Sequence, residues 1–181
     1  MALLIPRHAV LTGAPGAGKT TLLDAAAGAG LSTSPEVARQ LLQQPGGMAL
    51  REGDPVGFAE AMLEAHIREF ELAAAQPGPV LFDRGFPDVV GFLNVSGLLV
   101  PRSIDQVCRN LRYHGPVFRA PAWAAIYRQD HERIQTWEQA VASDEAVTAA
   151  WRSYGYDVID LPLAKVKERL EFLTAQLQSA V

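Results

Sequence analysis

Short apolar runs alternate with longer amphipathic segments along the 181 residues of the chain. Runs that are apolar at successive positions are typical of buried parallel strands, and the longer segments are typical of helices. Because the two kinds alternate throughout, the pattern predicts a single α/β domain over residues 1–181. It has three layers, with helices on both faces of a mostly parallel five-stranded sheet. The expected strands are residues 9–12, 31–33, 79–83, 117–118 and 156–161.

Capping and breaking residues set the expected helix boundaries. Ser34 and Ser143 are expected N-caps, and Pro35 would take the first helical position after Ser34. Arg119 is expected to interrupt the fourth strand. The expected helices are residues 20–27, 35–44, 55–75, 86–94, 103–113, 124–142, a segment from 144, and a closing helix with the apolar stripe Leu163, Val166, Leu170, Leu173 and Leu177.

Residues 13–20, GAPGAGKT, lie between the first expected strand and the first expected helix. They match G-x-x-x-x-G-K-[ST], the phosphate-binding P-loop, in its required strand-to-helix context. Glycines let backbone N–H groups approach phosphate oxygens, and the helix N-terminus adds partial positive charge. We expect Lys19 to reach the β- and γ-phosphates and the Thr20 hydroxyl to bind Mg²⁺. The residues expected to bind the nucleotide are Gly13, Ala14, Pro15, Gly16, Ala17, Gly18, Lys19, Thr20 and Thr21.

Asp83-Arg84, at the end of the third expected strand, is a second candidate. Ligands bind at the carboxyl ends of parallel strands, so Asp83 and the P-loop are expected to share one cleft. Asp83 is expected to hold Mg²⁺ or to activate the nucleophile. A kinase would use this carboxylate to take the proton of a substrate hydroxyl, with Arg84 steadying phosphate, whereas an ATPase needs only the carboxylate. A solvent-exposed Asp/Arg pair in a turn would explain the same residues without a function.

Residues 127–133, YRQDHER, form a third candidate. Arg128 and Arg133 would serve as lid arginines if this segment closes over the phosphates, because guanidinium groups neutralise charge on the transferring phosphoryl group. Lid closure also excludes water, which favours transfer over hydrolysis. From the residues alone, a solvated helix face on which Asp130 and Glu132 pair with the arginines explains this segment better.

Composition narrows the classes of function and the location. The net charge is −4, so no basic surface indicates nucleic-acid binding. No apolar run approaches the length of a membrane span, and the first residues do not resemble a signal peptide. The single cysteine, Cys108, excludes an internal disulfide and suits a reducing compartment, so a cytoplasmic location is expected. The histidines are scattered without the spacing of zinc ligands.

The motifs, taken in order, resemble a family of small bacterial predicted ATPases, an AAA-domain family related to the ribosylnicotinamide kinase domain. The resemblance covers nearly the whole chain, and its later motifs are more specific than the P-loop. It implies a P-loop kinase-like α/β domain with a lid segment. No second helical domain follows the core, so a ring-forming AAA machine is not expected. The matching segments are residues 13–23, 35–39, 82–93, 116–136 and 154–162.

The resemblance implies roles for particular residues. Asp83 would be the base or a magnesium-shell carboxylate, Arg84 would contact phosphate, and Arg128 and Arg133 would be lid arginines. The acceptor pocket would be lined by Glu36, Arg39 and Asp88.

The leading hypothesis is a kinase that transfers the γ-phosphoryl group of ATP, with Mg²⁺, to a hydroxyl of a nucleoside-like or other small polar acceptor. The alternative is a nucleotide-dependent switch or ATPase that acts through a protein or lipid partner. A kinase needs a closed acceptor pocket, whereas a switch needs only the nucleotide site and a segment that moves. ATP is preferred over GTP because no Asn-Lys-x-Asp motif is present. The oligomeric state stays open.

Overall fold

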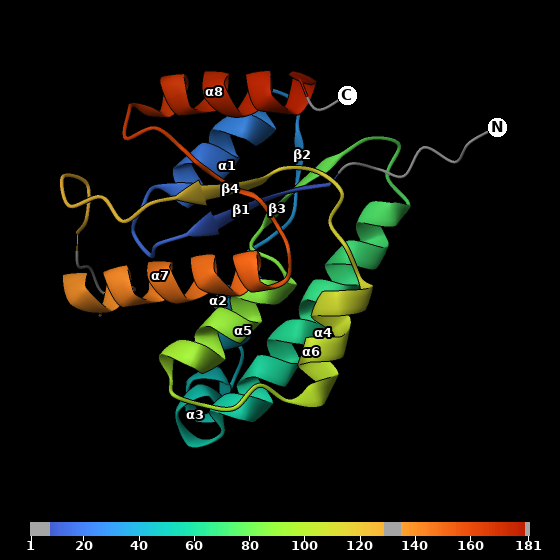
Figure 1. Ribbon diagram of the computed structural model, residues 1–181, viewed down its shortest axis with the longest axis vertical. Coiled ribbons are helices and arrows are strands. Elements are labelled where there is room, and N and C mark those ends of the chain that lie inside the picture. The colour runs from blue at the N-terminus through green and yellow to red at the C-terminus, as the bar shows by residue number, and fades with distance from the viewer. Residues whose placement is uncertain (1–7, 129–134, 180–181) are drawn as a thin grey trace.

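The computed structural model describes residues 8–128 and 135–179. At its centre is a parallel sheet of five strands in the order β2-β3-β1-β4-β5 (Figure 1). The predicted α/β fold with a parallel five-stranded sheet is therefore confirmed. The strands are β1 (Ala9–Gly13), β2 (Ser32–Thr33), β3 (Val80–Asp83), β4 (Val117–Ala120) and β5 (Val158–Asp160).

Helices cover both faces of the sheet, which makes three layers (Figure 1). Two helices, α1 (Lys19–Gly28) and α8 (Val166–Ser179), pack against each other on one face. The other helices lie on the opposite side. They are α2 (Val37–Gln43), α3 (Gly47–Gly53), α4 (Pro55–Ala74), α5 (Phe86–Val95), α6 (Arg102–Asn110) and α7 (Trp137–Ser153).

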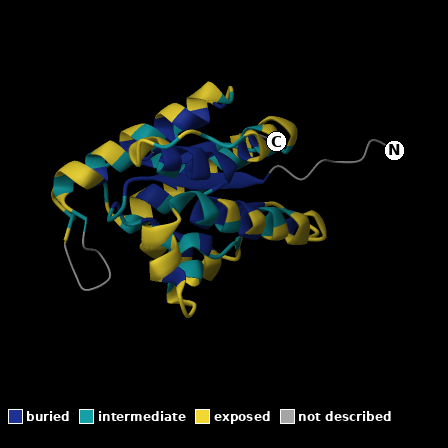
Figure 2. Cartoon of the chain, turned by 90° about the horizontal axis from the view of Figure 1, so that it is seen from below, coloured by how far each residue is buried: buried dark blue, intermediate teal, exposed yellow. Residues whose placement is uncertain are grey.

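The alternation of side chains along the strands divides the core in two. Leu11 on β1 and Leu81 on β3 belong to the cluster that also contains Leu22 and Leu173 of α1 and α8. The neighbouring residues in each strand, among them Phe82, belong to a larger cluster with α4, α5, α6 and α7. Successive strand residues point to opposite faces, so β1, β3, β4 and β5 contribute to both clusters, whereas the two residues of β2 belong to neither. The inner strands β1, β3 and β4 are accordingly buried almost throughout between helices whose outer faces are exposed, whereas the edge strands β2 and β5 are partly exposed (Figure 2).

The register of the sheet brings three functional segments to one edge. Leu11 of β1 pairs with Asp83 of β3, and Gly13 pairs with Ala120 of β4. Because the strands are parallel, the P-loop, Asp83 and the chain leaving β4 all emerge at the same side of the sheet.

One predicted helix boundary is wrong in an informative way. We expected a helix over 124–142 and a new one after Ser143, but residues 124–126 form a turn and α7 runs without a break through Ser143. The helix begins with a capping box, in which Thr136 Oγ1 accepts from Gln139 N–H and the Gln139 side chain accepts from Thr136 N–H. These reciprocal bonds satisfy two backbone donors, so Thr136 defines the start of the helix.

Four smaller predictions are also wrong. Ser34 does not cap a helix, since α2 begins at Val37 and Ser34 Oγ accepts from the Asp83 N–H at 3.0 Å. Arg119 does not interrupt β4, because it pairs in register with both neighbouring strands. A short helix, α3, lies between residues 44 and 55, where no helix was expected. Leu163, expected in the apolar stripe of the closing helix, lies before α8 and is exposed.

No helix among the residues that the structure describes is both long enough and apolar enough to cross a membrane.

Candidate nucleotide and acceptor site

Three glycines shape the loop between β1 and α1. Gly13, Gly16 and Gly18 have φ values of +119°, +73° and +76°, which favour glycine over any residue with a Cβ. Gly13 also lies against the Ala120 backbone, and a Cβ there would collide with it. The Ala14 N–H donates to the Ala120 carbonyl at 3.0 Å, which fastens the loop to β4. The loop conformation therefore depends on the glycines and on the neighbouring strand together.

Lys19 lies folded back over this loop. Its Nζ donates to the carbonyl oxygens of Ala14 at 2.6 Å and Gly13 at 3.4 Å. The side chain is buried, and burial, with Arg84 nearby, lowers the pKa of Lys19 to about 7. The chain thus holds this amine beside the loop where an anion would meet it.

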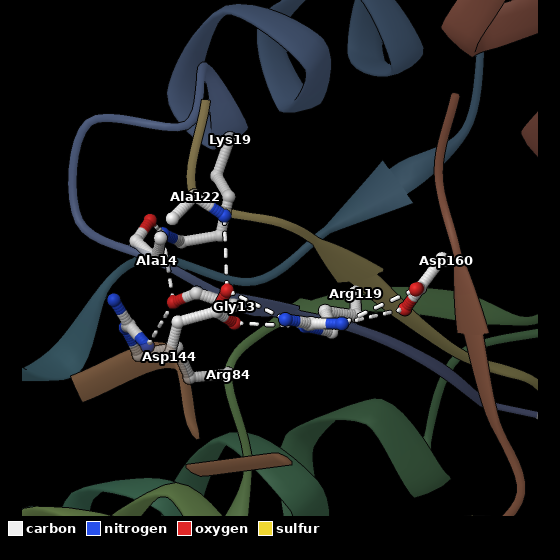
Figure 3. A network of polar contacts seen from close by, with 8 residues as sticks. All are labelled: Gly13, Ala14, Lys19, Arg84, Arg119, Ala122, Asp144 and Asp160. Atoms are coloured by element: carbon white, nitrogen blue, oxygen red, sulfur yellow. Dashed lines mark hydrogen bonds and ion pairs between the residues drawn. The ribbon is translucent and has the colours of Figure 1, made fainter. Parts of the chain in front are cut away.

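Arg84 is the one residue other than glycine, among the described residues, with a positive φ, at 69°. Such a conformation costs on the order of 1–3 kcal/mol and persists where the surroundings hold it. Here the Arg84 N–H donates to the Leu11 carbonyl at 3.0 Å, and Nη1 donates to Gly13 O at 3.2 Å and to Asp88 Oδ1 at 3.1 Å. Figure 3 shows Lys19 and Arg84 converging on the Gly13 carbonyl. The strained backbone aims the guanidinium at the P-loop.

Asp88, in the first turn of α5, accepts hydrogen bonds on both carboxylate oxygens. Besides Arg84, its donors are Thr12 Oγ1 at 2.5 Å, Gly85 N–H at 3.0 Å and Trp151 Nε1 at 2.9 Å. We expected Asp88 to line the acceptor pocket, and it does border the cavity described below. Its oxygens are nevertheless occupied by groups of the protein, which makes it an anchor for Arg84 and for the start of α5.

Asp83, at the end of β3, is the opposite case. The carboxyl is buried, and its Oδ1 accepts no hydrogen bond from the residues that the structure describes. Desolvation, with the nearby carboxylate of Glu36 as the second cause, raises the pKa of Asp83 to about 6. A buried, unbonded carboxylate oxygen next to Lys19 and Arg84 can take a proton or bind a cation.

A cavity of about 730 Å³ opens beside the P-loop. One end is lined by P-loop residues that include Lys19 and Thr20, and Gly13, Ala14 and Ala17 are buried behind them. Glu36 and Arg39, joined by an ion pair of 3.3 Å, line another wall, so these two predicted residues share one cavity with the P-loop. The remaining wall comes from α3, α4, α5 and α7 and includes Met48, Phe58, Met62, His66, Val89, Phe92, Ser143 and Val147.

Thr20 and Asp83 can be compared with the needs of a magnesium ion. Thr20 is exposed on the cavity wall, and Asp83 provides the buried oxygen that no described residue bonds. Magnesium is usually bound by one or two protein oxygens together with phosphates and water. The described residues contain no cluster of three or more His, Cys, Asp or Glu side chains that could hold a metal. The residues present fit an ion that is held partly by nucleotide phosphates.

The proposed lid is described only in part. Arg128 is exposed and is not among the described residues that line the cavity, and its Nη1 donates to the Tyr127 carbonyl at 2.9 Å. The Tyr127 ring contacts Trp137 at the start of α7, with 5.5 Å between centroids. Arg133 lies outside the described residues, so both lid roles stay predictions.

Two arginines to which the sequence assigned no role in the site, Arg119 and Arg169, hold the segments around it together. Arg119 pairs with Asp144 of α7 at 2.8 Å and with Asp160 of β5 at 3.2 Å, and Asp144 also accepts from Ala122 N–H (Figure 3). Arg119 therefore braces the chain that leaves β4. Arg169 of α8, which is buried, donates to the P-loop carbonyl of Ala17 at 2.8 Å. Neither contact has a local sequence signal, because the partners are distant in the chain.

The geometry of the site does not identify the protein family, but comparison with known families does. The AAA domain family matches residues 8–169. The chain belongs to this AAA domain family. The family predicted from the sequence motifs is therefore confirmed. No curated protein matches the chain by sequence.

Solved structures of a deoxyadenosine kinase and of NadR protein share the fold. Deoxyadenosine kinase from M. mycoides with bound dATP superposes with a TM-score of 0.70 at 14% identity, over 94% of this chain and 99% of that chain. The same kinase with bound dCTP gives 0.65 at 16% identity, over 95% and 99%. NadR protein in complex with NR gives 0.66 at 14% identity, over 96% of this chain and 51% of that chain. At these identities the likeness establishes the fold.

Proposed function

We propose that the protein is a Mg·ATP-dependent kinase that phosphorylates a hydroxyl of a nucleoside-like or other small polar acceptor. The observation that carries this proposal is that one continuous cavity joins the P-loop to a wall built by helices α2 to α5 and α7. A hydrolase or switch needs the nucleotide end of such a cavity only. A kinase needs space for a second substrate next to the phosphates.

ATP would bind with its phosphates on residues 13–21. Phosphate oxygens would replace the Ala14 and Gly13 carbonyls as partners of Lys19, whose amine is already held at 2.6 Å from Ala14 O. Arg84, aimed at the same loop, would neutralise charge that develops on the transferring group. Arg128 and Arg133 would complete this charge compensation from the lid.

Thr20 and Asp83 would hold Mg²⁺, which would neutralise phosphate charge when bound. Asp83 would also accept the proton of the acceptor hydroxyl. The hydroxyl oxygen forms the new bond to the γ-phosphorus, the bond from that phosphorus to the bridging oxygen breaks, and ADP leaves. The raised pKa of Asp83, about 6, suits a group that gives and takes a proton near neutral pH.

The solved neighbours support this proposal as analogies of fold. Deoxyadenosine kinase from M. mycoides carries dATP or dCTP, and NadR carries NR. All of these ligands suit a cavity that accepts a nucleotide-like or nucleoside-like molecule beside a P-loop. On the acceptor side of this chain, Glu36 and Arg39 are the polar groups that would contact the acceptor. No observation favours a nucleic-acid or membrane partner, and we propose a cytoplasmic enzyme.

The test measures ADP release by purified protein with Mg·ATP, alone and with a panel of nucleosides, sugars and other small alcohols. We expect one class of acceptor to raise turnover by orders of magnitude, and the phosphorylated product to appear in equal amount. Tight ATP binding without stimulation by any acceptor would reject the kinase and favour the nucleotide switch.

A further inference from the structure

One face of α4 forms the floor of the cavity. Phe58, Met62 and His66 follow each other at intervals of four residues, so they lie on the same side of the helix. All three are buried, and all three line the cavity. Two of them are apolar, and the third is not.

His66 is 3% exposed and has no hydrogen-bond partner among the residues that the structure describes. Its only ring neighbour there is Phe86, whose centroid lies 6.4 Å away at an interplanar angle of 81°. Because His66 lines the cavity, its ring nitrogens can be reached from the cavity side, by solvent in the free protein and by a ligand in the complex. An apolar residue would pack at the same place without offering these polar atoms, so the imidazole is the polar group that this part of the wall offers to a ligand.

The other buried histidine shows what a structural histidine looks like in this chain. His8 is 4% exposed, and its Nδ1 accepts from the Val80 backbone N–H at 3.2 Å. It links the start of β1 to β3 and lies away from the cavity wall. His66 is equally buried but lines the cavity, and it lacks such a bond.

The chemistry of the surrounding wall indicates what could meet His66. Phe58 and Phe92 stand 5.7 Å apart at 61°, and Met62 and Val89 extend the same apolar surface. Such a surface suits a flat ring. Of the charged residues on the wall, Asp88 and Arg84 lie near enough to His66 to act on it, but they are paired with each other at 3.1 Å, and over the whole wall the cations outnumber the acids. An uncharged ring therefore fits this part of the cavity better than a cationic one. The charged residues of the wall are Lys19, Glu36, Arg39, Arg51, Arg84 and Asp88.

The protonation state of the imidazole agrees with that chemistry. Burial lowers the pKa of His66 to about 4, with Asp88 and Arg84 near enough to act on it in opposite directions. A neutral imidazole offers one N–H donor and one acceptor nitrogen. It can therefore bond to the donor–acceptor edge of a heterocycle without bringing a charge into the apolar wall.

We infer that His66 determines acceptor specificity by hydrogen bonding to an uncharged heteroaromatic ring that lies on the wall formed by Phe58, Met62 and Phe92. This inference rests on the proposed kinase function and names its substrate class, which is nucleosides with a neutral base. Acceptors without such a ring, such as free sugars, would make no hydrogen bond to His66 and would leave the apolar wall in contact with water.

The test measures binding directly, so that it does not depend on turnover. Adenosine, guanosine, cytidine, uridine and, as the control without a ring, D-ribose are titrated calorimetrically into protein with Mg²⁺ and a non-hydrolysable ATP analogue. We expect at least one nucleoside to bind and ribose not to bind at the same concentrations. His66→Leu should weaken nucleoside binding about tenfold to a hundredfold while the ATP analogue binds as before.

Two further variants separate recognition from folding. His66→Gln, which keeps a donor and an acceptor, should retain part of the affinity and replaces the leucine variant if that protein does not fold. His8→Leu is the matched control. His8→Leu should lower the melting temperature because it leaves the Val80 N–H without its acceptor, and it should leave the nucleoside affinity unchanged. His66→Leu should leave the melting temperature unchanged or raised.

The outcomes distinguish the two proposals. Nucleoside binding that His66→Leu does not weaken, or wild-type protein that binds no nucleoside, overturns the role of His66. If no nucleoside binds but another acceptor stimulates ADP release, the kinase stands and the substrate class is wrong. If nucleosides bind through His66 but none is phosphorylated, the kinase fails and the recognition site stands.

Discussion

The end of β3 and the first turn of α5 each hold one buried carboxylate, and the protein uses the two in opposite ways. Asp88 on α5 accepts bonds from Thr12, Gly85, Trp151 and Arg84. Asp83 on β3 has an oxygen that no described residue bonds, and its pKa is raised by burial. A buried carboxylate whose oxygens are all hydrogen-bonded holds parts of the fold together. A buried carboxylate with an unbonded oxygen carries a desolvation cost that a bound ligand or a proton can relieve.

The same contrast separates the two ends of the cavity. At the P-loop end, backbone groups, Lys19 and Arg84 are bonded to one another before any ligand arrives. At the far end, the wall is apolar and His66 has no partner among the described residues. Under the proposed function, phosphate binding would therefore depend largely on the backbone of the P-loop, and acceptor recognition would depend on individual side chains.

The largest effect should come from Asp83→Asn. The amide cannot take the hydroxyl proton and binds Mg²⁺ poorly, so acceptor-dependent ADP release should fall about a thousandfold. The melting temperature should not fall, because the change removes a buried charge that has no partner on one oxygen. Steady-state kinetics and thermal unfolding of the same preparation check both halves. Retained turnover would show that another group takes the proton of the acceptor hydroxyl, and Glu36 would be the first candidate to test.

Asp88→Asn should have the opposite pattern, because its main effect should be to lower the free energy of unfolding. It leaves the buried guanidinium of Arg84 without its countercharge and turns an amide nitrogen toward N–H donors, so unfolding should cost about 3 kcal/mol less. Urea unfolding at constant m measures the loss. An unchanged midpoint would mean that Asp88 is not an anchor and would remove the contrast with Asp83.

Trp151→Phe sharpens the assignment of Asp88 with a smaller change. The variant removes the indole N–H donor at 2.9 Å from Asp88 Oδ2 but keeps an aromatic ring in the core. A lost hydrogen bond to a charged group should lower stability by about 2 kcal/mol. Nucleotide affinity, measured by fluorescence or calorimetry, should stay within about twofold. A larger loss of affinity than of stability would place Trp151 in the binding site itself.

The smallest expected effect is the pH dependence of magnesium binding. The pKa of Asp83 is raised to about 6, so the ionised form that binds Mg²⁺ predominates above that pH, and protons compete below it. The apparent affinity of the nucleotide complex for Mg²⁺ should therefore be constant above about pH 7 and fall up to tenfold per unit below about pH 6. Magnesium titrations from pH 5 to 8 test this. The fall should be smaller in Asp83→Asn, in which only the terminal phosphate of the nucleotide still takes up a proton near pH ~6. An equal fall in the variant would assign the whole effect to the nucleotide.

Several features of the site could be predicted because they are local. The P-loop is recognisable from the spacing of its glycines, Lys19 and Thr20, since backbone conformation over eight residues sets its shape. Asp83 and Arg84 could be placed at the edge of the sheet beside the P-loop because apolar runs identify parallel strands and the strand ends share one edge. Of the two, Arg84 lines the cavity, and Asp83 is buried behind the described lining residues. The predictions failed at Ser34, Ser143 and Arg119, where contacts distant from the local signal decide the structure. Ser34 bonds to β3, and the Thr136 capping box starts the helix that runs through Ser143. Arg119 pairs with Asp144.

The sequence by itself determined the family, the alternation of strands and helices, and the phosphate-binding loop, because each depends on residues that are neighbours along the chain. Only the tertiary structure decided that Asp88 is an anchor, that Asp83 keeps an unbonded oxygen, and that His66 lies in the cavity without a partner. The physical reason is that the hydrogen-bond partners of a side chain, and the cost of burying it, depend on the residues packed around it. That neighbourhood is assembled here from segments as far apart as Thr12, Asp88 and Trp151.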